Sequence, residues 1–315
     1  MAKKNFLHDT QDFLAVLDRV SQRMKIAPQF VEKDYWLMHS LWALHHLGLY
    51  YELKGGTSLS KGWELISRFS EDVDIKIIPP EGMSVASSKN HTQPRHRESR
   101  SKYFDWLMSI LAIPGASYVQ RDHEFDDHDL RNAGFRLGYK SHFDEIPGLK
   151  YDVLLEVGFD VTTPNEKKDI SSWAFDEARS LGIDILDNRA RAVPCYLPEY
   201  TFVEKLSAIS KKYRQDVDGK DVKNFTRHYY DIYQLLNEPR VQAFIGTEAY
   251  LTHKSARLNK GNEDDIKNNP AFSLPDASVR KKYADRLQNT ASLYFHGQPT
   301  IEEILARISL YIDKL

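Results

Sequence analysis

The chain has 315 residues, of which 41% are hydrophobic and 28% are charged, and its formal net charge is -2. This composition excludes a disordered chain. The near-neutral charge excludes a general attraction to nucleic acid or anionic membranes, so any polyanion must bind a local patch. The single cysteine, Cys195, excludes an internal disulfide and a cysteine-based zinc site.

The first fifty residues are expected to form two helices within residues 10–47. Pro28 opens the second helix and Gly48 ends it. The N-terminus is polar where a signal peptide would need an apolar run. Residues 37–51 are apolar, but they are too short for a membrane span and contain three histidines. We therefore expect a cytoplasmic protein that does not associate with membranes.

From about residue 50 to residue 190, short β-rich runs alternate with helical stretches. The clearest strands are expected at 72–78, 133–139 and 151–159. Beyond Pro194 and Pro198 the pattern becomes helical, with helices expected at 201–214, 222–237, 241–253, 277–293 and 300–314. The sequence thus predicts an α/β domain with N-terminal helices over residues 1–192 and a helical domain over residues 193–315.

The segment "LKGGTSLSKG" at 53–62 has the composition of a phosphate-binding turn. Glycines allow the backbone to approach a ligand closely, and the N-terminus of a helix offers unpaired N–H groups. We expect Gly55, Gly56, Thr57 and Ser58 to hold a phosphate group. A Walker A loop is excluded because it requires Gly-Lys-Ser/Thr, whereas the order here is Ser60-Lys61-Gly62.

The strand "DVDIKII" that follows alternates between apolar and charged side chains, so Asp72 and Asp74 share one face. Carboxylates at that spacing, roughly 7 Å, repel each other unless a cation lies between them. Oxygen ligands on a rigid element suit Mg²⁺ or Mn²⁺ bound together with substrate phosphates. The pair therefore predicts a divalent metal site.

The glycine turn followed by two aspartates on a strand resembles the ground plan of the polymerase β-like nucleotidyltransferases, and this resemblance implies a third carboxylate on a neighbouring strand. In "YDVLLEVGFD" at 151–160, Asp152, Glu156 and Asp160 share one face. Glu156 lies at the centre of the expected strand and fits best as the third metal ligand. The alternation of side chains alone leaves Asp160 open.

This ground plan resembles the polymerase β-like nucleotidyltransferases, and four separated motifs are similar to those of the AbiEii/AbiGii-type nucleotidyltransferase toxins. The motifs are "FVEKDYWL" at 30–37, "GGTSLSKG" with "RFSEDVDI" at 55–75, "TFVEKLSAI" at 201–209 and "RHYYDIYQLL" at 227–236. The resemblance implies a mixed-sheet nucleotidyltransferase domain that transfers NMP from an NTP with two metal ions. It also implies a bacterial toxin, often paired with an antitoxin protein, and some relatives act on transfer RNA ends.

The resemblance extends to individual residues. It implies that Arg68 and Ser70 contribute to nucleotide binding and that Asp231 serves as a base or as a positioning group for the acceptor. Lys205 would contact phosphate and steady the leaving pyrophosphate. Independently of the family, Thr201 and Glu204 form a capping-box pattern, which predicts a helix start at Thr201.

Two basic segments, 89–102 and 205–228, could bind an RNA acceptor such as tRNA. Three alternatives stay open from the sequence. A small-molecule nucleotidyltransferase of the antibiotic-modifying kind, or one that modifies a protein, would use the same Asp72 and Asp74. A non-catalytic nucleotide-binding interaction protein would be expected to show a damaged motif, and none is visible.

Overall fold

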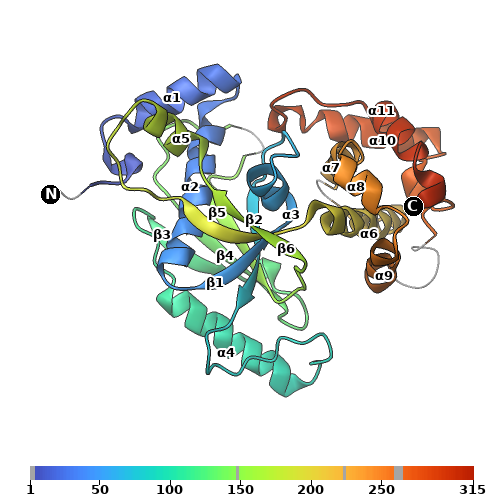
Figure 1. The fold of residues 1–315 in the computed structure, drawn as a ribbon, viewed down its shortest axis with the longest axis horizontal. Helices are drawn as coiled ribbons and strands as arrows, with labels where there is room; N and C mark the ends of the chain where they lie inside the picture. Colours follow the sequence, from blue (N-terminus) through green and yellow to red (C-terminus); the bar gives the residue numbers. More distant parts are fainter. Residues whose placement is uncertain (1–3, 147–148, 223–224, 259–264) are drawn as a thin grey trace. The chain divides into compact units, whose positions relative to one another are not determined.

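The computed structural model describes residues 4–146, 149–222, 225–258 and 265–315. The chain divides into two compact units, one of Met1–Gly62 with Ser70–Tyr196 and one of Trp63–Phe69 with Leu197–Leu315. The first unit is built on a mixed β-sheet and the regular elements of the second are helices, which confirms the α/β class (Figure 1). The division into domains at residues 1–192 and 193–315 stays a prediction.

The sheet of the first unit has seven described strands in the order β3-β4-β5-β2-β1-β7-β6. Their bounds are β1 Tyr50–Lys54, β2 Asp72–Ile78, β3 Tyr118–Asp122, β4 Asn132–Gly138, β5 Asp152–Gly158, β6 Asn165–Ile170 and β7 Ala190–Tyr196. At its centre, β2 pairs antiparallel with β1 and parallel with β5. The three strands expected from the sequence are confirmed to within one residue at each end.

The alternation of side chains in β2 gives the sheet two different faces. Val73, Ile75 and Ile77 are buried, whereas Asp72 and Asp74 are only half-buried. The pairing register continues both faces into β1 and β5, since odd-numbered residues pair with odd-numbered ones. The even-numbered face therefore carries the charged side chains.

Two helices cover the apolar face. The hydroxyl of Tyr51, on the apolar face of β1, donates to the carbonyl of Leu41 in α2 (Pro28–His46). The ring of Phe104 in α4 (Pro94–Ile110) lies 6.2 Å from that of Phe135 in β4. Because one face is covered in this way, a chemical site built on the sheet must lie on the other face or at the strand ends.

The helices α1 (Phe13–Met24) and α5 (Trp173–Ser180) pack against α2, and the three helices form a layer in the first unit (Figure 1). The two helices expected within 10–47 are confirmed. Pro28 occupies the first turn of α2, as predicted. No helix in the described part of the chain is long and apolar enough to cross a membrane.

The second unit is organised around α6 (Pro198–Val217), which packs against α7, α8 and α9. The other helices are α7 Arg227–Leu235, α8 Pro239–Phe244, α9 Glu248–Arg257, α10 Ala277–Gln288 and α11 Ile301–Ser309. The capping-box prediction at Thr201 is wrong, because α6 begins three residues earlier with Pro198 at its first position. The single helix expected at 241–253 is also wrong, because Gly246, with φ +84°, separates two helices.

Candidate functional site

The predicted phosphate turn follows β1 directly. After Lys54 the chain forms one short helical turn, α3 (Gly55–Thr57), and continues as a π-helical turn over Ser58–Gly62. Gly55 has φ +68°, and a Cβ on it would overlap the Oδ2 atom of Asp74 and lie 3.0 Å from its Cγ. Only glycine therefore fits between the turn and the carboxylate of Asp74.

Two of the three hydroxyl side chains of the turn, those of Thr57 and Ser58, are buried. Thr57 is buried, and its Oγ1 donates to the carbonyl of Asp72 at 2.6 Å. Ser58 is fully buried beside Cys195, which is itself buried. The Thr57 hydroxyl thus ties the turn to the start of β2.

The helical turn ends at Gly62 rather than continuing to Ile66, where the apolar spacing would allow it. Residues 63–69 leave the first unit and belong to the second. Glu64 has φ +55°, a value that a helix cannot contain. The chain returns to the first unit at Ser70, whose Oγ lies 3.4 Å from the carbonyl oxygen of Asp72.

The carboxylates of Asp72, Asp74 and Glu156 share one face of two adjacent strands. In the parallel pairing of β2 with β5, Asp74 is directly opposite Glu156, and Asp72 is opposite Leu154. All three side chains are half-buried. The structure therefore brings Glu156 beside the predicted aspartate pair.

The other two acids considered as third ligands have different surroundings. Asp160 lies beyond the end of β5, where its Oδ1 accepts a hydrogen bond from the backbone N–H of Val161 and lies 3.9 Å from Lys89 Nζ. Asp152 accepts a hydrogen bond at 2.7 Å from Arg136 on β4. Register and surroundings thus favour Glu156 over both.

The carboxylate oxygens of these three residues are the kind of ligand that a hard divalent cation such as Mg²⁺ prefers. They lie on rigid, paired strands, and Gly55 leaves room for the Asp74 carboxylate. The side chains as placed do not converge, however. Among the residues that the structure describes, no group of three His, Cys, Asp or Glu side chains is close enough to hold a metal ion. A bound cation would have to draw the three carboxylates together.

Arg68, Lys205, His228 and Asp231 form a group in the second unit, which we call the Asp231 cluster; all but the half-buried His228 are buried. Arg68 donates from Nε to Asp231 Oδ1 at 2.6 Å and from Nη2 to Oδ2 at 2.8 Å. Lys205 Nζ lies 2.8 Å from the same Oδ2 and 3.4 Å from His228 Nδ1. Asp231 is 0% exposed. Its carboxylate is therefore a shared anchor for two cations.

The pKa values of Asp231 and Lys205 are both lowered, for different reasons. Burial alone would raise the pKa of Asp231, but Arg68 and Lys205 outweigh burial and hold that pKa well below its usual range. Burial, with the positive charge of Arg68, lowers the pKa of Lys205 although Asp231 opposes the shift. A carboxylate with so low a proton affinity is poorly suited to act as a general base. Such a carboxylate is suited instead to holding the side chains of Arg68 and Lys205 in place.

Three consecutive charged residues of α2 are fully buried, and the sequence reasoning assigned them no role: Glu32, Lys33 and Asp34. Glu32 accepts hydrogen bonds from Ser141 Oγ at 2.8 Å and from the backbone N–H of His142 at 3.1 Å. The signal that could have revealed them is a run of three charges inside an otherwise apolar helix, since charged residues are almost never fully buried unless paired.

Asp34 connects α2 to the phosphate turn. Its Oδ1 lies 2.6 Å from Nζ of Lys61, and its Oδ2 accepts the backbone N–H of Trp173 at 2.8 Å. The Lys61 ammonium also lies 3.9 Å from the centre of the Trp173 ring. Lys61 is thus held at the far end of the turn by a carboxylate and an aromatic face.

Much of the positive charge in the basic segment 89–102 is used within the protein. Arg100 is fully buried and donates to the carbonyls of Ala86, His91 and Asp129. The Arg97 Nε donates to the carbonyl of His128, and Lys102 pairs with Glu98 at 2.7 Å. These groups hold the loops around α4, which leaves less charge for a nucleic acid than the sequence suggests.

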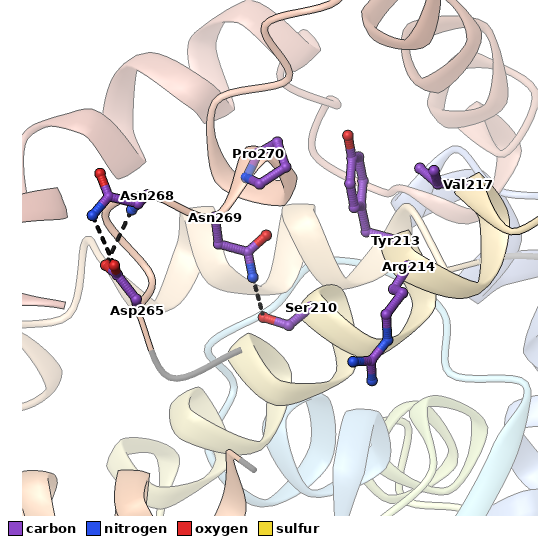
Figure 2. A pocket seen from close by; sticks show the side chains of 8 residues that line it. All are labelled: Ser210, Tyr213, Arg214, Val217, Asp265, Asn268, Asn269 and Pro270. Carbon is purple, nitrogen blue, oxygen red and sulfur yellow. Dashed lines mark hydrogen bonds between the residues drawn. The ribbon is translucent and has the colours of Figure 1, made fainter. Parts of the chain in front are cut away.

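The second unit also has a pocket of about 380 Å³ along α6 (Figure 2). Figure 2 shows that Asn269 donates to Ser210 and that Asn268 donates to Asp265, so these groups are bonded within the pocket wall. Tyr213 also lines the pocket. None of the predicted site residues lines it.

Comparison with known proteins identifies one family. A family model described as "Nucleotidyl transferase AbiEii toxin, Type IV TA system" matches residues 36–307, a range that includes every predicted site residue. An antigenic nucleotidyltransferase-like protein from Paracoccidioides brasiliensis has a similar solved structure, with 15% sequence identity, 72% of this chain and 90% of that chain covered and a TM-score of 0.34. That likeness is too weak to carry an argument. No curated protein matches the chain.

Proposed function

The chain belongs to the AbiEii nucleotidyl transferase toxin family, and from this premise we propose that it transfers the NMP part of an NTP to an acceptor hydroxyl. The observation that carries the proposal is the register that places Asp74 opposite Glu156, on the face of Asp72 and against Gly55. In the proposed reaction, the acceptor oxygen bonds to the α-phosphorus and releases its proton. The bond from that phosphorus to the β-phosphate oxygen breaks, and pyrophosphate leaves.

We further propose that Asp72, Asp74 and Glu156 hold Mg²⁺ or Mn²⁺. When bound, the cation would supply the positive charge that the phosphates require and would lower the pKa of the acceptor hydroxyl. The chain itself would hold the reacting groups in place. Gly55 leaves space for the Asp74 carboxylate, and Thr57 ties the proposed phosphate turn to Asp72, the first residue of β2.

For the second unit, we propose that Asp231 positions Arg68 and Lys205 rather than taking a proton. Its low pKa and its two bonds to Arg68 support this role. Contacts of Arg68, Ser70 and Lys205 with the nucleotide stay predictions.

RNA is the proposed acceptor, and an antitoxin encoded with the toxin is the proposed partner. The family description supports the partner, since it names a toxin–antitoxin system. The exposed cations Lys211, Arg214 and Lys220, in and just after the second half of α6, support a polyanionic acceptor.

The proposal is tested by incubating purified protein with Mg²⁺, total cellular RNA and protein, and each α-³²P nucleotide in turn. We expect label on a discrete RNA band and no label when the same nucleotide carries γ-³²P, because only the α-phosphate is transferred. Asp72→Ala should remove the labelling. Asp184→Ala, which changes an exposed acid of the first unit, should keep it.

Other outcomes would identify the alternatives. Label on protein would indicate a protein acceptor, and transfer from γ-³²P would indicate a phosphotransferase. Label found only in low-molecular-weight products would favour a small-molecule nucleotidyltransferase. Nucleotide binding that survives Asp72→Ala without any transfer would leave a binding module.

The third carboxylate gives a separate prediction. Glu156→Gln should lower the rate of transfer by at least about 10-fold. Mutating a residue that only supports a metal ligand already lowers activity or metal affinity by about 10–100-fold, and Glu156→Gln removes a ligand itself. Asp160→Asn should leave transfer nearly unchanged, because Asp160 lies beyond the strand. Rates measured at several Mg²⁺ concentrations check this, and the opposite ranking would assign the ligand to Asp160.

A further inference from the structure

Lys54 is the last residue of β1, and Asp74 of β2 lies directly opposite it in the antiparallel register. Both residues lie on the even-numbered face of the sheet, and both are half-buried. Directly opposite residues of such a pair have Cβ atoms roughly 5 Å apart, so opposite charges there can form an ion pair. In the part of the chain that the structure describes, however, neither side chain has a hydrogen bond or an ion pair.

The neighbouring position on the same two strands behaves differently. Glu52 and Lys76 are also directly opposite each other on this face, two residues away along each strand. Lys76 Nζ lies 3.2 Å from both carboxylate oxygens of Glu52. The strand pairing therefore permits an ion pair, and its absence between Lys54 and Asp74 is a property of that position. The Asp74 carboxylate lies against Gly55 instead, where it fills the space that a Cβ would take.

The lysines of the turn and of β2 already have partners within the protein. Lys61 Nζ lies 2.6 Å from Asp34 Oδ1, and Lys76 is paired with Glu52. Lys54 differs from both, since its ammonium has no carboxylate of the described chain to satisfy it. An ammonium has three donors and forms strong, charge-assisted hydrogen bonds with phosphate oxygens. The position beside Asp74 is therefore suited to an anionic ligand.

We propose that Lys54 binds a phosphate oxygen of the NTP on the β1 side of Asp74. The inference rests on the proposed function, because phosphates come to this place only if the nucleotide shares a cation with Asp72, Asp74 and Glu156. The strand β2 lies between β1 and β5, so Lys54 and Glu156 flank Asp74 on opposite sides. The carboxylates then face the cation, and Lys54 contacts the phosphate chain itself.

Lys54→Gln should weaken the binding of inorganic tripolyphosphate by at least roughly 10-fold in the presence of excess Mg²⁺, because hydrogen bonds to charged groups are the strong ones. Lys54→Arg, which keeps the charge, should retain most of the affinity. The ammonium has no bond within the described chain to lose. The thermal midpoint of Lys54→Gln without ligand should therefore equal that of the wild type. Isothermal titration calorimetry and fluorimetry on the full chain measure the two quantities.

Lys76→Gln is the matched control, because Lys76 lies on the same face and belongs to the neighbouring cross-strand pair. It should show the reverse behaviour. Its thermal midpoint should fall, since the buried Glu52 loses a charged partner, and its affinity for tripolyphosphate should not change.

Unchanged affinity of Lys54→Gln for tripolyphosphate overturns the inference. If its thermal midpoint falls as well, Lys54 serves as an ion-pair partner of Asp74. If the KM for RNA rises instead, Lys54 contacts the acceptor. Failure of the wild type to bind tripolyphosphate also overturns the inference. The labelling assay on the wild type then separates the two failures: label transfer would show that only the role of Lys54 is wrong, whereas loss of both signals would remove the proposed function too.

Discussion

Gly55→Ala is expected to lower nucleotide transfer by at least about 100-fold while the protein stays folded. A methyl group at this position would overlap Asp74 Oδ2 and lie 3.0 Å from Cγ, so the carboxylate must move away from the turn. A displacement of about 1 Å at a reacting centre can cost about 100-fold in rate. The positive φ adds about 1–2 kcal/mol of backbone strain, which is small beside a stability of about 5–15 kcal/mol.

The matched control for this prediction is Gly182→Ala. Gly182 has φ +74°, close to that of Gly55, but a Cβ there would meet no atom within 4 Å. It should show the same backbone cost and no loss of transfer. Labelling rates and thermal midpoints of both variants check the prediction. Equal, small effects on both would mean that the Asp74 carboxylate has room to move without consequence.

The strand that carries the acidic pair could be predicted to the residue, because strict alternation of apolar and charged side chains admits only one strand and one burial pattern. The glycine turn before it could be placed for a similar reason, since Gly55 is required both by its φ and by its contact with Asp74. Local chemistry was sufficient for both features. The choice of Glu156 also followed from its central position in β5, and the register supports it.

Contacts between distant parts of the chain could not be predicted. Arg68 follows the phosphate turn by only a few residues, so its place among the expected nucleotide ligands was reasonable. In the structure it bonds to Asp231, 163 residues away, and its guanidinium is buried. Spacing along a sequence describes which residues share one element, but it does not say which element will pack against which.

The buried charges of α2 were missed for a related reason. Helical periodicity assigns a charged residue to solvent, and Glu32, Lys33 and Asp34 would together occupy most of the helix circumference. The structure instead gives each of them a polar partner in a different segment: the 141–143 loop, the carbonyl of Lys150 and the ammonium of Lys61. Only the unusual density of charge within an apolar helix hinted at this arrangement.

The segment 63–69 gives the Asp231 cluster a wider role. Phe69 N donates to the carbonyl of Leu293 at 2.7 Å, and Phe295 N donates to the carbonyl of Ser67 at 2.8 Å. Arg68 anchors this segment from its centre through Asp231. The segment joins the Gly55–Gly62 turn to β2 along the chain, and the cluster holds this connection within the second unit.

Asp231→Asn is expected to destabilise the protein by about 3–5 kcal/mol, the usual cost of leaving a buried charge unpaired. The substitution keeps the shape of the side chain but removes the negative charge shared by Arg68 and Lys205. Chemical denaturation at neutral pH measures the loss. Because the pKa of Asp231 is depressed by folding, its contribution is complete above the ordinary aspartate pKa of about 4 and is lost as the pH falls through the folded value. The difference between wild type and variant should therefore narrow below about pH 4.

Asp313→Asn provides the control, because it makes the same change in an ion pair of the second unit, with Lys267, in which both side chains are largely exposed. It should leave stability unchanged, since an exposed pair contributes little. The comparison also decides what Asp231 does. If Asp231→Asn strongly lowers stability and loses transfer only in proportion to its unfolded fraction, Asp231 acts as an anchor for Arg68 and Lys205. Near-normal stability with transfer abolished would contradict the anchor and restore the prediction that Asp231 acts on the acceptor as a base.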